Sequence, residues 1–194
     1  MTDAVAAWDA EAADYDAPAD HGLLDPDVRA AWRRLLLGLL PAAPARVAEM
    51  GCGTGTLTVL LADEGYAVDG VDFSPEMLRR AEVKAEGREQ VRFVEGDASR
   101  PPLDDAEYDV VLSRHVLWAM SDPADALRRW AGLLRPGGRL VLVEGLWSNG
   151  AGLRAEQTVD LVEGLGRHAE LARLSDPSYW GREIDDDRYA VLGT

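Results

Sequence analysis

Short apolar runs and helix-like spacing alternate through the middle of the chain. Between residues 46 and 145, the apolar runs are separated by segments with helical periodicity or by a polar loop. Short buried strands that alternate with helices are typical of a parallel sheet covered on both faces. The pattern predicts strands at 46–50, 67–71, 91–94, 108–113 and 139–145, and helices at 56–64, from 74 to about 86, and from 122 to 135.

The two ends of the chain carry other patterns. Residues 3–16 are rich in alanine and place Trp8 and Tyr15 at helical spacing, and a second amphipathic helix follows from about residue 26. After residue 150, the pattern predicts a glycine-interrupted helix over 151–168, then an irregular polar segment and one last strand at 188–193. The ends therefore add helices and one strand to the central pattern.

Composition and charge limit the kinds of molecule that this protein is expected to bind. The net charge of −15 repels phosphate backbones and anionic membranes, which argues against a nucleic-acid or membrane partner. Acidic residues stand where a signal peptide needs basic ones, and no apolar run approaches the roughly 18 residues that cross a bilayer. Cys52 is the only cysteine, so no intrachain disulfide or cysteine-based metal cluster can form. We expect a cytoplasmic protein.

A glycine-rich turn follows the first predicted strand. Gly51, Gly53 and Gly55 alternate just before a predicted helix, where a missing Cβ lets the backbone approach a ligand closely. In doubly wound sheets, ligands bind at this end of the strands. The dinucleotide fingerprint needs its third glycine where this chain has Thr56, which counts against NAD(P) or FAD.

Two carboxylates indicate which ligand the turn accepts. Glu49, just before the glycines, would repel a diphosphate and would suit an ammonium group. Asp72 ends the second predicted strand about 20 residues further on, where an acid can accept hydrogen bonds from ribose hydroxyls. A nucleoside with a cationic tail fits both acids, and S-adenosylmethionine is such a molecule.

Five segments, taken in order, resemble the consecutive motifs of class I S-adenosylmethionine-dependent methyltransferases. They are VAEMGCGTGTLTVLLA, VDGVDFSPEML, VEGDASRPPL, YDVVLSRHVLWAM and LLRPGGRLVLVEG. The resemblance implies an α/β fold: a Rossmann-like, doubly wound, seven-stranded sheet, mostly parallel with the last strand antiparallel, plus N-terminal helices. It also implies a single methyltransferase domain over residues 1–194, in which the helical segment 1–41 covers the active site.

The resemblance carries cofactor-binding roles to particular positions. The glycine loop would hold the methionine part, the end of the second strand the ribose and one face of the adenine, and the loop after the third strand the adenine amino edge. The end of the fourth strand would lie beneath the sulfonium, and one N-terminal residue would reach the cofactor. The residues expected to contact it are Tyr15, Glu49, Gly51, Cys52, Gly53, Gly55, Asp72, Phe73, Met77, Asp97, Ala98, Ser113 and Arg114.

A general base is needed only when the methyl acceptor arrives protonated, because the cofactor brings its own leaving group. His115 follows the fourth predicted strand and is the expected base, with His21 as its rival. Trp118, Trp147 and Trp180 are rich aromatic surface for this chain, and Trp118 and Trp147, which follow the fourth and fifth predicted strands, would wall an apolar acceptor pocket or, alternatively, pack in the core. The run S-R-H-V replaces the Asn/Asp-Pro-Pro-Tyr run of DNA and protein-amide methyltransferases, which argues against that subgroup.

The sequence therefore predicts a methyltransferase that modifies O, N or C of a small molecule, releases S-adenosylhomocysteine, uses no metal and acts as a monomer or homodimer. Two alternatives stay open. One is methylation of a peptide or protein side chain, for which the acidic surface would suit a basic substrate. The other is a non-catalytic regulatory protein that binds S-adenosylmethionine.

Overall fold

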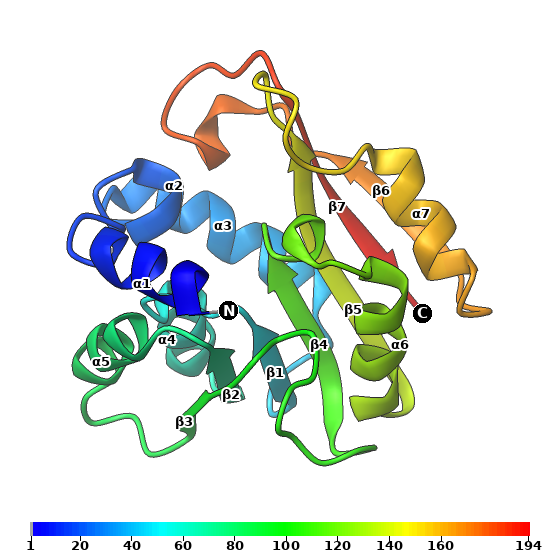
Figure 1. The fold of residues 1–194 in the computed structure, drawn as a ribbon, viewed down its shortest axis with the longest axis horizontal. Helices are drawn as coiled ribbons and strands as arrows, with labels where there is room; N and C mark the ends of the chain where they lie inside the picture. Colours follow the sequence, from blue (N-terminus) through cyan, green and yellow to red (C-terminus); the bar gives the residue numbers. More distant parts are fainter. Residues whose placement is uncertain (1) are drawn as a thin grey trace.

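The computed structural model describes residues 2–194 and contains a seven-stranded sheet with helices on both faces (Figure 1). The strand order is β3-β2-β1-β4-β5-β7-β6, with β7 antiparallel to both of its neighbours and the other strands parallel. This confirms the predicted fold class. The strands are β1 (Arg46–Met50), β2 (Ala67–Asp72), β3 (Val91–Glu95), β4 (Tyr108–Arg114), β5 (Leu134–Leu146), β6 (Ala169–Arg173) and β7 (Asp187–Gly193).

Helices cover the sheet in two layers. One hydrophobic cluster joins α3 and α4 to one face, a second joins α6 and α7 to the other, and α5 packs beside α4 against β2 and β3. Within residues 2–194, no helix combines the length and the apolar content of a membrane-spanning segment. The helices are α1 (Thr2–Glu11), α2 (Ala19–Gly22), α3 (Pro26–Leu39), α4 (Thr56–Asp63), α5 (Pro75–Lys84), α6 (Pro123–Leu133) and α7 (Ala155–Glu163), with 3₁₀ turns η1 (Leu117–Ala119) and η2 (Pro177–Tyr179).

Three of the helices begin by the same local device. Asp25, Ser74 and Asp122 cap α3, α5 and α6, and each side chain accepts a hydrogen bond from a backbone N–H of the first turn. Proline follows each cap at the first helical position, where its fixed φ and missing N–H cost nothing. The helix starts are therefore set by local sequence, and the start of α5 lies directly after the end of β2.

Two buried tryptophans connect the helical layers to loops at the ligand-binding end of the sheet. Trp32 of α3 donates its indole N–H to the carbonyl of Tyr179 at 2.7 Å. Trp130 of α6 donates to the carbonyl of Ala98, also at 2.7 Å, and so fixes the loop that follows β3. Replacing either ring by alanine would cost about 3–5 kcal/mol of stability.

The predicted helix over 151–168 is wrong at both ends. Helix α7 covers only Ala155–Glu163, because Gly164 follows directly and Gly166 adopts a left-handed φ of 75°. The next residues form strand β6, which the pattern did not predict because its side chains are mostly exposed and do not alternate. The N-terminal helix is also shorter than the predicted 3–16, since α1 ends at Glu11 and a turn follows.

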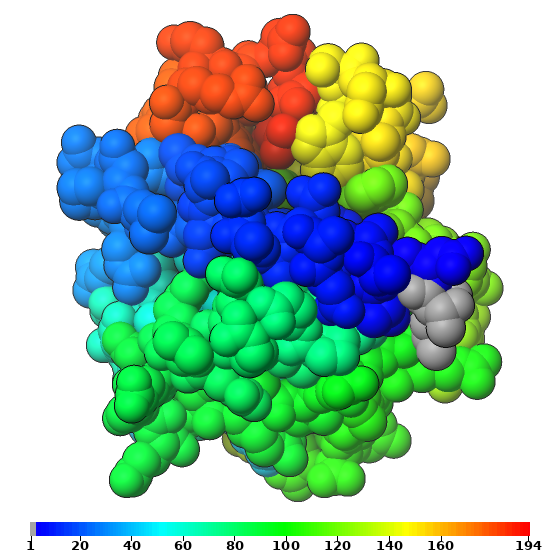
Figure 2. Space-filling model, turned by 60° about the vertical axis from the view of Figure 1, so that its left-hand side comes forward, coloured from blue at the N-terminus to red at the C-terminus, as the bar shows by residue number. Residues whose placement is uncertain are grey.

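The N-terminal segment lies across the start of α5. Figure 2 shows it in dark blue between the green region that contains α5 and the orange to red C-terminal region. Asp9 accepts a hydrogen bond from the Ser74 hydroxyl at 2.5 Å. Asp16 pairs with Lys84 at 2.7 Å and accepts from the Thr54 hydroxyl at 2.6 Å. Two carboxylates therefore attach this segment to the loop and helix that border the ligand-binding end of the sheet.

Candidate active site

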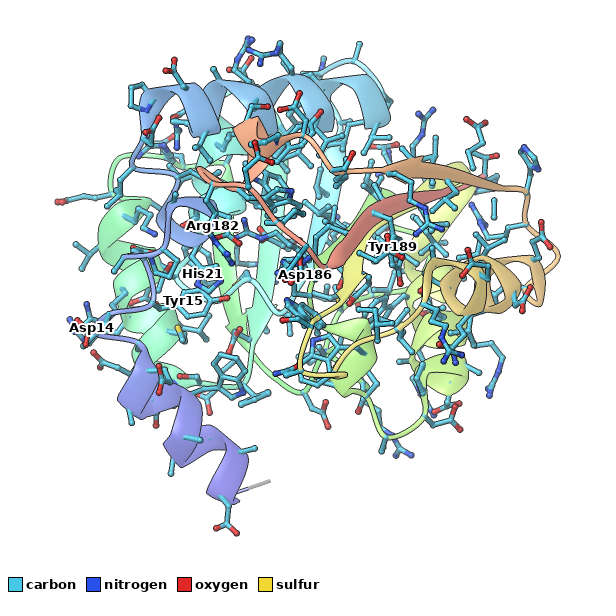
Figure 3. The ribbon with its side chains drawn as sticks, turned by 90° about the horizontal axis from the view of Figure 1, so that it is seen from above. Asp14, Tyr15, His21, Arg182, Asp186 and Tyr189 are labelled. Carbon is cyan, nitrogen blue, oxygen red and sulfur yellow. The ribbon has the colours of Figure 1, made fainter. Side chains whose placement is uncertain are left out.

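A cleft of about 390 Å³ lies at the carboxyl ends of β1, β2, β3 and β4, in the size range of small-molecule sites. The sheet order reverses between β1 and β4, which is where doubly wound sheets bind ligands. Figure 3 looks onto this end of the sheet. Ten of the residues predicted to contact the cofactor or to act as the base line the cleft: Tyr15, Gly51, Gly53, Asp72, Phe73, Met77, Asp97, Ala98, Arg114 and His115.

The backbone of the glycine loop forms one wall of the cleft, because its glycines have no side chains to fill the space. Gly51 and Gly53 have φ values of 65° and 53°, a region that L-residues rarely adopt. A Cβ on Gly51 would come within 2.4 Å of the Val116 side chain, and one on Gly53 within 3.3 Å of the Tyr15 ring. The loop therefore fits between the segment after β4 and the N-terminal segment only as bare backbone.

Asp72 holds two turns together at the cleft. Its carboxylate accepts hydrogen bonds from the backbone N–H groups of Gly53 and Ser74, each at 2.9 Å. Burial raises the pKa of Asp72, although these N–H groups act in the opposite direction. Because each carboxylate oxygen can accept more than one hydrogen bond, Asp72 can still accept from hydroxyl groups of a ligand.

Glu49 lies beneath the glycine loop and is not part of the lining. It is 4% exposed, and the Thr58 hydroxyl donates a hydrogen bond to one of its oxygens at 2.5 Å. Burial is the main cause that raises the pKa of Glu49 to about 7. The carboxyl group therefore exchanges a proton near neutral pH, one layer below the position where the sequence places the cofactor.

Three other predicted contact residues also lie outside the lining. Cys52 is buried, and its sulfur packs against Gly70, where a Cβ would come within 2.9 Å of it. Gly55 makes room for Ala81 of α5. Ser113 is buried, and its hydroxyl has no hydrogen-bond partner in the described part of the chain. These residues support the cleft from behind.

The opposite end of the cleft is lined by loops after β2 and β3. Asp97 accepts a hydrogen bond from the Ser99 N–H at 2.8 Å, which fixes this acid at the turn. Ala98, Phe73 and Met77 line the same cavity. Of the described residues, no three His, Cys, Asp or Glu side chains are arranged to hold a metal ion.

His115 follows β4 in a strained backbone conformation. Its φ is 60°, and its N–H donates to the carbonyl of Val143 at 2.8 Å. The ring lies edge-on to Trp147 at a centroid distance of 5.2 Å and is stacked on Trp180 at 6.1 Å. Burial lowers the pKa of His115 well below its usual value, and the neighbouring positive charge of Arg114 lowers it further. The imidazole is therefore neutral at physiological pH, and its buried Nε2 has no partner within residues 2–194.

Glu144 of β5 fixes the segment that carries His115. One of its oxygens accepts hydrogen bonds from the N–H groups of Val116 at 3.0 Å and Leu117 at 2.8 Å, and the other is buried without a partner in the described chain. Burial raises the pKa of Glu144 to about 8. Glu144 is not among the site residues predicted from the sequence, although a single acid at the end of the apolar run LVLV is a visible signal.

The N-terminal segment closes one side of the cleft. Tyr15 covers Gly53 and is stacked on His21 with ring centroids 4.6 Å apart, and Figure 3 shows these two side chains together. Arg114 donates to the carbonyl of Asp20 at 2.5 Å, and its guanidinium lies 5.0 Å from the centre of the Trp32 ring. His21, the rival base, does not line the cleft, and one of its ring nitrogens bonds the carbonyl of Tyr15.

The predicted aromatic residues have different environments. Trp118 lines the cleft at 36% exposure, its indole N–H donates to the carbonyl of His115 at 2.9 Å, and its ring lies 5.3 Å from that of Trp147. Trp180 is buried and does not line the cleft. Trp8 of α1 lines the cleft at 42% exposure and was missed, because its helical spacing from Tyr15 indicates packing and not a ligand.

Comparison with known proteins supports the same assignment. The family model for a methyltransferase domain matches residues 48–142. An uncharacterized methyltransferase of Mycobacterium tuberculosis is 42% identical over 135 residues, which cover 70% of this chain and 52% of the relative. A demethylmenaquinone methyltransferase of Thermus thermophilus is 40% identical over 117 residues, which cover 58% of this chain and 53% of the relative. The chain thus spans about half the length of the curated relatives it matches.

Solved structures share the fold. The methyltransferase in a Haloferax volcanii complex with a methyltransferase activator superposes with a TM-score of 0.75 at 22% identity, over 96% of each chain. The phosphoethanolamine N-methyltransferase 2 of Haemonchus contortus, solved with S-adenosyl-L-methionine, superposes with a TM-score of 0.71 at 16% identity, over 84% of this chain and 52% of that one. The matched domain supports assignment of the chain to the class I S-adenosylmethionine-dependent methyltransferases, whose fold the solved structures share.

Proposed function

We propose that this protein transfers a methyl group from S-adenosylmethionine to an oxygen, nitrogen or carbon atom of a small molecule. One observation carries the proposal: a single cleft is lined by the backbone of the glycine loop, by Asp72, by Asp97 and by His115. Along the cleft, Asp97, Asp72, the glycine loop and His115 follow one another in the order of the strands β3, β2, β1 and β4, which matches the base, the ribose, the cationic tail and the reacting group of such a nucleoside. The relative named demethylmenaquinone methyltransferase supports a small-molecule acceptor.

The side chains in the cleft fit S-adenosylmethionine. Gly51 and Gly53 leave room for the methionine part, and Asp72 can accept hydrogen bonds from both ribose hydroxyls. Of the described lining residues, Arg114 alone carries a full positive charge, which suits the carboxylate of the cofactor. Glu49, below the loop, is the acid that would attract the ammonium group. The bound cofactor supplies an electrophilic methyl group together with its own leaving group.

The protein itself must position the acceptor, exclude water and remove a proton from acceptors that arrive protonated. Tyr15 and Trp8 line the cleft from the N-terminal segment, which reduces the access of water. His115 is neutral because burial lowers its pKa, so its imidazole is in the form that accepts a proton from a hydroxyl or ammonium nucleophile. His115 is needed only for an acceptor that arrives protonated.

Isothermal titration calorimetry tests the cofactor half of the proposal. Wild-type protein is expected to bind S-adenosylmethionine and S-adenosylhomocysteine, Gly53→Arg to lose both, and Asp72→Ala to bind them more weakly. Val83→Ala, an exposed change, is the control. Transfer of a labelled methyl group into metabolite fractions, compared with protein fractions, then tests the acceptor class. Absence of cofactor binding by the wild type would overturn the proposal.

A further inference from the structure

We infer that the methyl acceptor is a neutral, planar, apolar molecule that stacks on Trp118, and not a phosphorylated, carboxylated or cationic one. This inference rests on the proposed function, because it concerns the part of the cleft that the cofactor would leave open.

The segment after β4 supplies the lining that the cofactor roles leave unused. It contributes Val116, Trp118, Ala119, Met120 and Ser121. None of these side chains carries a charge, and only the hydroxyl of Ser121 and the indole N–H of Trp118 are polar. A surface of this composition recognises a ligand by its shape and apolar area more than by its charge.

Trp118 is held in place and presents its ring to the cleft. Its indole N–H already donates to the carbonyl of His115, and the ring of Trp147 supports it from the side. The exposed large apolar residues of the described chain are Trp8, Leu24, Val83, Trp118 and Leu171, of which only the two tryptophans line the cleft. A half-exposed ring with a satisfied N–H offers a flat apolar face, and such faces pair with other aromatic rings.

Among residues 2–194, no side chain that lines the cleft offers a free positive charge to an anionic acceptor. Arg114 is bonded to the N-terminal backbone, and the proposed function assigns it to the cofactor. Arg188 is buried between Trp147 and Trp180 and pairs with Asp186 at 2.9 Å. The net charge of −15 adds a long-range repulsion for anions.

One exposed arginine lies near the rim. Figure 3 shows Arg182 pointing toward His21, and its neighbour Gly181 packs on Ala19, so this guanidinium is beside the N-terminal segment. It is not part of the cleft lining. A phosphorylated acceptor would need Arg182, which makes this residue the natural test of the competing class.

A cationic acceptor would also lack a partner. The acids that line the cleft are Asp72 and Asp97, and both belong to the cofactor side. Each already accepts backbone N–H bonds, two for Asp72 and one for Asp97. Of the described residues that line the acceptor side, none carries a carboxylate, so a positive charge there would have only the ring face to stabilise it.

Three naphthalene probes with the same ring and different charge test the inference. They are 1-naphthol, 1-naphthyl phosphate and protonated 1-naphthylmethylamine, each titrated by calorimetry into protein with and without S-adenosylhomocysteine. We expect 1-naphthol to bind at least about tenfold more tightly than either charged probe, since a tenfold ratio corresponds to the loss of one well-placed interaction. Stronger binding of a charged probe would overturn the inference, as would a protein that binds S-adenosylhomocysteine but none of the probes.

Variants identify the surface that binds the probe. Trp118→Ala is expected to weaken 1-naphthol by about tenfold, and Trp118→Phe to stay within about threefold, because phenylalanine retains an aromatic face. Arg182→Gln and the exposed Leu171→Ala are controls that leave the affinity unchanged. Loss of S-adenosylhomocysteine binding by the wild type would count against the proposed function, whereas unchanged 1-naphthol binding by Trp118→Ala, or weakened phosphate-probe binding by Arg182→Gln, would count against this inference.

Discussion

Glu49→Gln should stabilise the folded protein while it weakens the binding of S-adenosylmethionine. The carboxyl group is buried, has one hydrogen bond from Thr58, and has its pKa raised by burial from 4.5 to about 7. Between these two pH values the folded state holds a proton that the unfolded state has released. Stability therefore falls as pH rises through this window, and the full cost is present above pH 7. Glutamine has the same shape and no charge to bury.

The size of the effect follows from the two pKa values. The difference between 4.5 and about 7 corresponds to about 3 kcal/mol at pH 8, and to under about 1 kcal/mol at pH 5. For a domain of this size, 1 kcal/mol shifts Tm by about 2–4 °C, so Glu49→Gln should gain roughly 6–12 °C at pH 8 and about 2–3 °C at pH 5. The affinity for the cofactor should change in the opposite direction, because only the carboxylate attracts an ammonium group.

Differential scanning calorimetry at both pH values measures the first effect, and isothermal titration calorimetry measures the second. The wild-type affinity for S-adenosylmethionine should rise between pH 6 and 8 as Glu49 ionises, and the variant should lose this dependence and bind at least about tenfold more weakly at pH 8. The exposed Glu82→Gln serves as the matched control. An equal Tm change at both pH values, or a variant that binds as tightly as the wild type, would refute the reasoning.

Three further changes test the loops around the cleft. Asp16→Asn should loosen the N-terminal segment, since it removes the ion pair to Lys84. Limited proteolysis followed by mass spectrometry should then show faster cleavage before residue 25 than in the wild type. An unchanged cleavage rate would contradict this prediction. Glu144→Leu leaves the N–H groups of Val116 and Leu117 unpaired, so the acceptor KM should rise at least about tenfold with cofactor affinity unchanged. Glu144→Gln should restore the wild-type KM, because its amide oxygen can accept both hydrogen bonds. If Glu144→Gln does not restore the KM, the hydrogen bonds are not the reason for the effect. His115→Ala should lower kcat about 10²–10⁴-fold for a hydroxyl acceptor. Because the pKa of His115 is lowered, the wild-type kcat, measured with saturating cofactor, should stay flat as pH falls through 6.5; an inflection there would remove His115 as the base.

The parts of the fold that the sequence predicted are those in which local chemistry decides. Strands β1, β2 and β4 and the second half of β5 are apolar because they are mostly buried, so each is visible as a short run without reference to its partners. The glycine loop was visible for a similar reason, since positive φ at Gly51 and Gly53 restricts the residue type at each position. The sequence of β6 carries no such signal. It is an edge strand, and only its pairing with β7 defines it as a strand.

The parts of the site that the sequence could not predict depend on tertiary contacts. Trp8 enters the cleft because Asp9, its neighbour, binds Ser74, the N-cap of α5, and nothing within α1 indicates this. Glu49 was expected to contact the cofactor directly, but its carboxyl turns toward Thr58 and lies beneath the lining. The residue type was informative in both cases, whereas the direction of the side chain was set by residues distant in sequence.

Unpaired polar atoms collect where the sheet meets the cleft, and their position argues that they serve a ligand more than the fold. Ser113, His115 and Glu144 each keep a buried polar atom without a hydrogen-bond partner in the described residues, and all three lie at the ends of β4 and β5. A buried polar atom that stays unpaired costs about 1–3 kcal/mol, and the left-handed φ of His115 adds about 1–3 kcal/mol of strain. Apolar residues of similar size would leave no polar atom unpaired there, although the strain of the left-handed backbone would remain. If stability alone determined the residues at these positions, Ser113→Ala would raise Tm without affecting any ligand; a loss of cofactor or acceptor affinity in that variant would instead show that this end of the sheet trades stability for binding.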